Sequence, residues 1–101
     1  MEDRLKLHEI LVNILGSRYV YFQPPATLKM NYPCIIYSRS TGDTQFADNA
    51  PYTFKKRYQI TYIDSNPDNN IIEKICKLPL CVYDRHYTAD NLNHDVFNLY
   101  F

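Results

Sequence analysis

The sequence has very little glycine, no tryptophan and no net charge. Only 2 of its 101 residues are glycine, which is not the composition of a loop-rich scaffold. Its 11 basic and 11 acidic side chains give a formal net charge of zero. Attraction to nucleic acid or to an anionic membrane through bulk charge requires a basic excess. The composition therefore disfavours a dedicated nucleic-acid or membrane-surface protein.

Cysteine is scarce, and long apolar runs are missing. Cys34, Cys76 and Cys81 are odd in number and lack the spacing of metal ligands. Two of them lie in apolar stretches, which favours reduced thiols in a core over a disulfide framework. The charged first residues lead into an amphipathic segment, so we expect neither a signal peptide nor a membrane span. We therefore expect the protein to be made and used in the cytoplasm.

Aromatic residues are plentiful. Ten tyrosines and five phenylalanines make up 15% of the chain, a composition that favours pleated sheet. Tyrosine also suits surfaces that are apolar on one side and hydrated on the other, as assembly interfaces are. The length predicts one domain over residues 1–101. Because a domain of this size buries only roughly 60–70% of its unfolded surface, contacts with copies or partners would add to its stability.

Apolar residues at helical spacing occupy two segments, and five stretches have the composition of strands. The expected helices span residues 2–15, ended by Gly16, and about 67–78, with Ser65 or Asn66 as the N-cap. The expected strands are 19–22, 34–39, 53–63, 80–88 and 93–101, the last two joined by a turn at 89–91. This order predicts an α+β fold in which two helices pack on a mostly antiparallel sheet of four to five strands.

Two features of this pattern indicate contacts with other molecules. A long β-hairpin loop covers residues 40–54 and contains Phe46 and Tyr52, and long loops in small domains are usually functional or disordered. We expect it to order on a partner; the alternative is a tip whose aromatic rings fold back on the sheet. The terminal strand is apolar through Tyr100 and Phe101, which must be buried in the sheet or against a neighbour.

The candidates for catalysis or metal binding are weak. His86 and His94, with Asp84, Asp90 and Asp95 nearby, could ligate Zn²⁺ or Fe²⁺ if the two strands brought them together. Asp84 and His86 are expected on one strand face, but His94 need not meet them, and hydrogen-bonded turn and edge-strand residues are the simpler explanation. Cys34 could pair with a histidine as a nucleophile, yet it begins an apolar strand, where a small thiol packs as a hydrophobe. We expect no enzyme activity, no cofactor and no metal.

Lys55, Lys56 and Arg57 form a basic run among aromatic residues. Such a mixture suits single-stranded nucleic acid, in which phosphates are neutralised and bases stack. A solvated strand edge whose lysines discourage strand addition is the simpler explanation, and a salt-bridging interface strip is another. A nucleic-acid module therefore remains an alternative function.

Four segments together carry a resemblance to a known family. They are Tyr-Pro-Cys-Ile-Ile-Tyr (32–37), Phe-Ala-Asp-Asn-Ala-Pro-Tyr (46–52), Arg-Tyr-Gln-Ile-Thr-Tyr (57–62) and the closing stretch from Asp90 to Tyr100. With the helix before them, they resemble the tail-completion or tail-terminator proteins of long non-contractile-tailed bacteriophages of Gram-positive hosts. The resemblance covers nearly the whole chain. Its sharpest parts are 46–52 and 90–100, which strand periodicity alone does not explain.

This resemblance implies a structural virion protein of the tail and neck. A hexameric ring of α+β subunits would cap the tail tube, stop its polymerisation and join the tail to the connector or stopper protein of the head. DNA would pass through the lumen without specific binding, which a net charge of zero permits. Another head–tail connector component, such as a head-completion or stopper protein, is the nearest alternative. A small metal- or thiol-dependent hydrolase is a more distant one.

The resemblance implies no catalytic residues and places residues 46–52 toward the tail tube or the connector. Tyr100 and Phe101 would lie in the sheet or at a subunit contact. Combined with the basic run, this gives the following candidate interface residues: Phe46, Asp48, Tyr52, Phe54, Lys55, Lys56, Arg57, Tyr100 and Phe101.

Overall fold

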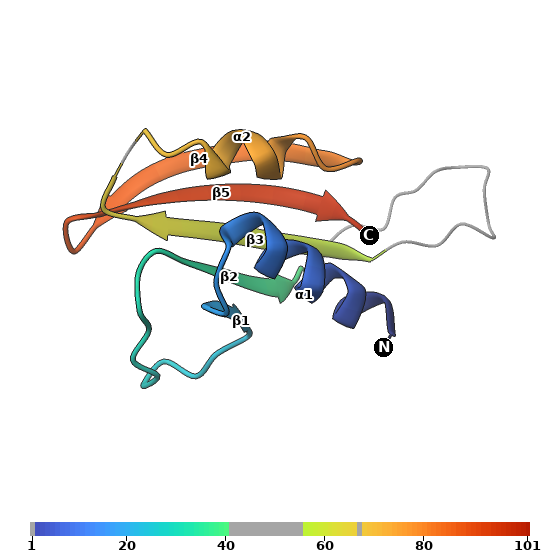
Figure 1. Ribbon diagram of the computed structural model, residues 1–101, viewed down its shortest axis with the longest axis horizontal. Helices are drawn as coiled ribbons and strands as arrows, with labels where there is room; N and C mark the ends of the chain where they lie inside the picture. Colours follow the sequence, from blue (N-terminus) through green and yellow to red (C-terminus); the bar gives the residue numbers. More distant parts are fainter. Residues whose placement is uncertain (1, 41–55, 67) are drawn as a thin grey trace.

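The computed structural model describes residues 2–40, 56–66 and 68–101, and over these the chain has an α+β fold (Figure 1). In chain order the elements are α1 (Glu2–Leu15), β1 (Val20–Phe22), β2 (Cys34–Arg39), β3 (Arg57–Asp64), α2 (Ile71–Cys76), β4 (Cys81–Ala89) and β5 (Leu92–Tyr100). Both expected helices and all five expected strands are present. The fold class predicted from the sequence is confirmed.

The five strands form one mixed sheet in the order β1-β2-β3-β5-β4. The short β1 runs parallel to β2, and every other neighbouring pair is antiparallel. β2 and β3 are the antiparallel arms on either side of the long loop predicted over residues 40–54, most of which lies outside the described residues. The edges of the sheet differ, because β1 has three residues whereas β4 has nine.

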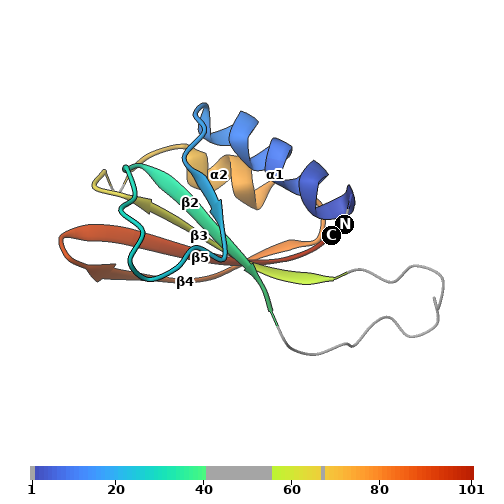
Figure 2. The same cartoon turned by 90° about the horizontal axis from the view of Figure 1, so that it is seen from below.

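Both helices cover the same face of the sheet (Figure 2). The core between the layers takes Leu7 and Leu11 from α1 and Ile71 and Ile75 from α2. Beneath them lie inward-pointing residues of the strands, in cross-strand register: Val20, Ile35, Tyr37, Tyr58, Ile60, Tyr62, Phe97 and Leu99. Cys34, Ile63 and Val96 are buried on the opposite face, in positions that alternate with these.

Helix α1 has the bounds that its apolar spacing predicts. Its chain reverses at Gly16, whose φ of 81° falls in the left-handed region and whose N–H donates to the carbonyl oxygen of Val12 at 2.8 Å. The expected apolar stripe was wrong at Leu5, which is 52% exposed. Leu5 and Leu7 are two residues apart, and that spacing places them on different sides of a helix.

Helix α2 begins at Ile71, later than the expected start at Pro67. The reason is a series of side-chain hydrogen bonds in the preceding segment. The carboxylate of Asp64 accepts hydrogen bonds from the Asn66 N–H at 3.1 Å and from the Asn69 side chain at 3.0 Å. The side-chain oxygen of Asn69 then accepts from the Ile71 N–H at 2.9 Å. The N-cap position is Asn70, whose side chain makes no capping hydrogen bond, so the expectation of Ser65 or Asn66 as the N-cap was wrong.

Strands β4 and β5 are joined by a tight hairpin. Asp90 and Asn91 have φ values of 54° and 63°, the left-handed pair that a two-residue hairpin turn of type I′ requires. The expected turn is therefore confirmed, with strand bounds one residue from those predicted. Neither helix in the described part of the chain has both the length and the apolar character needed to cross a bilayer.

Candidate functional site

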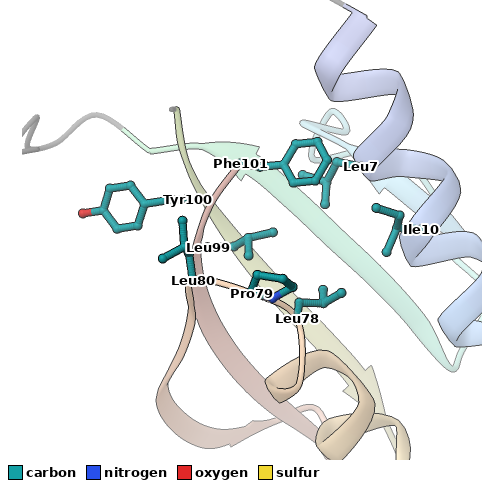
Figure 3. A pocket seen from close by; sticks show the side chains of 8 residues that line it. All are labelled: Leu7, Ile10, Leu78, Pro79, Leu80, Leu99, Tyr100 and Phe101. Carbon is teal, nitrogen blue, oxygen red and sulfur yellow. The ribbon is translucent and has the colours of Figure 1, made fainter. Parts of the chain in front are cut away.

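A surface groove lies where the end of β5 meets α1 and the connection between α2 and β4 (Figure 3). Its cavity volume is about 280 Å³. The lining is almost wholly apolar and consists of Leu7, Ile10, Leu78, Pro79, Leu80, Leu99, Tyr100 and Phe101. We call this feature the terminal groove. Concave, largely apolar sites of this kind accept apolar side chains of ligands or partners.

The terminal groove contains the two terminal residues that the sequence analysis selected. Phe101 lies beside Leu7 of α1, whereas the Tyr100 ring points away from that helix, as alternation along a strand requires (Figure 3). Phe101 also packs against the helix-side core. These rings were expected to be buried in the sheet or against a neighbour. The sheet buries part of each ring, both remain half-buried at the groove, and burial against a neighbour stays a prediction.

Four candidate interface residues come together at this end of the sheet. Arg57 is the cross-strand partner of Tyr100. The Phe101 N–H donates to the Lys56 carbonyl oxygen at 2.9 Å, and the Lys56 N–H donates to the Phe101 oxygen at 3.3 Å. The remaining candidates, Phe46, Asp48, Tyr52, Phe54 and Lys55, lie outside the described residues.

Leu80 is the most exposed of the groove residues that sequence reasoning did not select, because it was expected to begin a strand. Its φ is 60°, a left-handed conformation that costs a non-glycine residue roughly 1–2 kcal/mol. Its side chain is nevertheless 56% exposed at the groove. Strained residues persist where their surroundings hold them and cluster at functional sites. An exposed leucine held in this conformation is the most unusual feature of the terminal groove.

Strand β4 forms a long exposed edge beside the groove. Val82 is 64% exposed, and Tyr83 and Tyr87 are also exposed. The register with β5 shifts between Tyr83 and Arg85, where Asp84 is the extra residue of a β-bulge and forms a 2.8 Å ion pair with Arg85. A bulge and charged side chains in the middle of an edge strand oppose uninterrupted addition of another strand.

The residues considered for metal binding do not converge. His86 is paired with Asp95 on the helix side of the sheet, whereas His94 stacks on Tyr87 on the other side, with ring centroids 4.6 Å apart. Asp84 was expected on the same face as His86, and this was wrong because the bulge turns Asp84 toward Asn98. Among the described residues, no group of three His, Cys, Asp or Glu side chains could hold a metal ion.

The cysteines are all free, but their environments differ. Burial raises the pKa of the Cys34 thiol to about 12, so it is protonated at neutral pH and unsuited to nucleophilic attack. Burial also raises the pKa of Cys81 to about 11. Cys76 is exposed at the end of α2, so the expectation of a core thiol is wrong for this residue.

Comparison with known proteins gave no relative: the chain matches no protein-family model, no curated protein and no solved structure. The terminal groove, the exposed β4 edge and the α+β layers therefore provide the structural basis for a functional proposal.

Proposed function

We propose that this protein is a structural subunit of a bacteriophage tail. Its copies would form a hexameric ring that caps the tail tube, ends tube polymerisation and joins the tail to the head connector. The choice of this class of protein comes from the resemblance to tail terminators, which is carried by residues 32–37, 46–52, 57–62 and 90–100. The single structural observation that supports it best is the terminal groove, with Leu80, Tyr100 and Phe101 at the surface.

The chemistry of the groove supports an assembly role. A small domain gains from burying apolar surface against a neighbour, at roughly 25 cal/mol per Å² of area removed from water. The groove has a nearly complete apolar lining, and Leu80 adds a large exposed side chain at its margin. Buried anchors in pockets dominate the energetics of protein interfaces. Tail-tube subunits or the connector would supply such an anchor.

The experiment is polymerisation of the tail tube protein from the encoding phage genome, with and without this protein. Tube lengths are measured by electron microscopy, and the protein bound to tube ends is measured by pelleting. We expect short tubes that carry the protein at one end. Tubes that elongate unchanged and leave the protein in the supernatant would contradict the proposal, and binding to the connector alone would favour a neighbouring connector ring.

A matched pair of variants tests the role of the groove. Leu80 and Leu5 are leucines with similar exposures of 56% and 52%, but only Leu80 lines the groove. Asparagine tolerates the left-handed conformation at position 80. We expect Leu80→Asn to lose tube capping and Leu5→Asn to keep it. Equal activity of the two variants would show that the groove does not carry the function.

A further inference from the structure

Helix α1 forms one wall of the terminal groove and also makes a polar contact with the sheet. Leu7 and Ile10 supply the groove wall (Figure 3). Arg4 and His8, which precede and follow Leu7 on the helix, both reach the hydroxyl group of Tyr37 on β2. Its oxygen lies 3.3 Å from Arg4 Nη1 and 2.8 Å from His8 Nδ1. We call Arg4, His8 and Tyr37 the polar cluster.

The polar cluster joins the helix layer to the sheet layer. Tyr37 has no exposed surface, and its ring packs on Phe22 of β1 and Tyr58 of β3, with centroids 5.0 Å and 6.1 Å away. The His8 ring centroid lies 5.7 Å from that of Tyr37. The Arg4 guanidinium lies 4.4 Å from the centre of the Phe22 ring. The sheet therefore fixes the hydroxyl, whereas α1 supplies the groups that meet it.

Arg4 is the charged group that acts on His8. The helix residues one turn from His8 are Arg4, Leu5, Leu11 and Val12, and only the first is charged. Burial raises the pKa of Tyr37, which is therefore neutral near pH 7. The charged side chains on β1, β2 and α2, the elements packed against α1, are all exposed: Arg39, Glu73 and Lys74.

Protonation of His8 changes the character of this contact. Nδ1 of the neutral ring can accept from the Tyr37 hydroxyl when that nitrogen carries no proton, whereas both nitrogens of the protonated ring only donate. The hydroxyl oxygen would then face two cationic donors, His8 and Arg4. Burial and the Arg4 charge lower the pKa of His8, so the folded state favours the neutral ring. The contribution of the contact is complete above pH 6.5 and is lost as the pH falls through the lowered value.

We propose that the polar cluster is a pH-sensitive device that sets the position of α1 at the terminal groove. With His8 neutral, the contact holds α1 on β2 and fixes the groove wall. With His8 protonated, α1 shifts relative to Tyr37, and the wall moves with it because Leu7 lies between the two cationic residues. The coupling belongs to the fold, whereas its use in tube capping rests on the proposed function.

Nuclear magnetic resonance of the full chain between pH 7.5 and pH 5 measures the coupling. Leu78 and Leu80 report on the groove, because they line it from the connection between α2 and β4 and are not on the helix that carries His8. We expect their methyl resonances to titrate with the same midpoint as the His8 ring, below pH 6.5. The exposed Leu28 lies outside the groove lining and should not follow this titration.

The variant His8→Gln should abolish the titration of the groove methyl groups. Groove resonances that stay fixed while His8 titrates would overturn the proposal. Groove resonances that titrate unchanged in His8→Gln would overturn it as well, because another group would then be responsible.

A matched pair of variants tests the part played by Arg4. Arg4→Gln removes the charge that opposes protonation, so the midpoints of His8 and of the groove resonances should rise together toward pH 6.5. Lys6→Gln removes an exposed charge from the same helix and should leave both midpoints unchanged. Equal shifts in the two variants would assign the effect to the overall charge of the helix and overturn the role of the polar cluster.

The outcome is separate from that of the proposed function. A protein that caps tail tubes while its groove resonances do not follow His8 overturns the pH-sensitive device alone. A protein whose groove resonances follow His8 but which leaves tubes unchanged retains the device and contradicts the tail-terminator role.

Discussion

The Tyr100 N–H donates a 3.2 Å hydrogen bond to the carbonyl oxygen of Leu80. This bond attaches the last residue of β5 to a leucine in the left-handed conformation. It fixes the backbone on which the exposed Leu80 side chain stands, beside Pro79 and the half-buried Phe101. This backbone hydrogen bond, just outside the β4–β5 pairing, thus positions the apolar margin of the terminal groove without depending on the Leu80 side chain itself.

Replacement of Leu80 by glycine should separate stability from assembly. Glycine relieves the left-handed strain of roughly 1–2 kcal/mol but loses about 0.5–1 kcal/mol through its greater freedom in the unfolded chain. We expect the free energy of unfolding, measured by urea denaturation, to stay within about 1 kcal/mol of the wild type. Tube capping should be lost. A large loss of stability would show that Leu80 belongs to the core.

Two neighbouring positions on β5 should behave differently. Leu99 is buried in the core, so Leu99→Ala should destabilise the fold by roughly 2–5 kcal/mol. Phe101 is half-buried at the groove, and Phe101→Ala should cost only about 1 kcal/mol while abolishing assembly. Thermal unfolding and tube-end binding are measured together. Phe101→Ala that destabilises as much as Leu99→Ala, with assembly intact in the folded fraction, would contradict a surface role.

The stability of the protein should fall in mildly acidic solution because of His8. The Tyr37 hydroxyl accepts from Arg4 at 3.3 Å and lies 2.8 Å from His8 Nδ1, to which it can donate when that nitrogen carries no proton. Burial and the adjacent Arg4 charge lower the pKa of His8 below its usual 6.5. The folded state therefore favours neutral histidine, and its contribution is complete above pH 6.5 and is lost as the pH falls toward the lower folded value.

The measurement for His8 is urea denaturation between pH 7 and pH 5, with His8→Gln as the comparison. Glutamine offers an oxygen to the Tyr37 hydroxyl but does not titrate. We expect the wild type to lose more stability over this range than the variant. Parallel pH dependences would assign the effect to other groups.

Phe46 and Tyr52 provide a prediction that rests on the sequence alone. If the loop over residues 40–54 docks on a partner, changing both residues to serine should leave the thermal midpoint nearly unchanged and impair assembly on tubes. Circular dichroism and tube-end binding are the measurements. Loss of folding would place the two rings in the core.

Regular patterns in the sequence were sufficient to predict most of the fold. The helical spacing around Leu7 and Leu11 and the strand alternation around Tyr58 and Ile60 are local properties, so they identified α1 and β3. The late start of α2 was missed because side-chain hydrogen bonds of Asp64 and Asn69 determine it. The parallel pairing of β1 with β2 is a long-range choice that no local pattern specifies.

The candidate site was predicted only in part. The apolar end of β5 singled out Tyr100 and Phe101 as residues of the sheet or of a subunit contact, and the structure places both in the lining of the groove, which no sequence pattern predicted. Leu80 was missed because a leucine after proline gives no signal of a positive φ, which glycine or asparagine would have given. The bulge at Asp84 was missed as well, since an extra residue in a strand depends on its partner strand.

The most direct test of the ring-forming role is the native mass of the protein, alone and after release from tail tubes. Six copies of the 12.0 kDa chain have a mass of about 72 kDa. The proposal predicts this species, either in free solution or on the tubes from a monomeric pool. A stable monomer that remains monomeric with tubes present, and does not bind them, would contradict it.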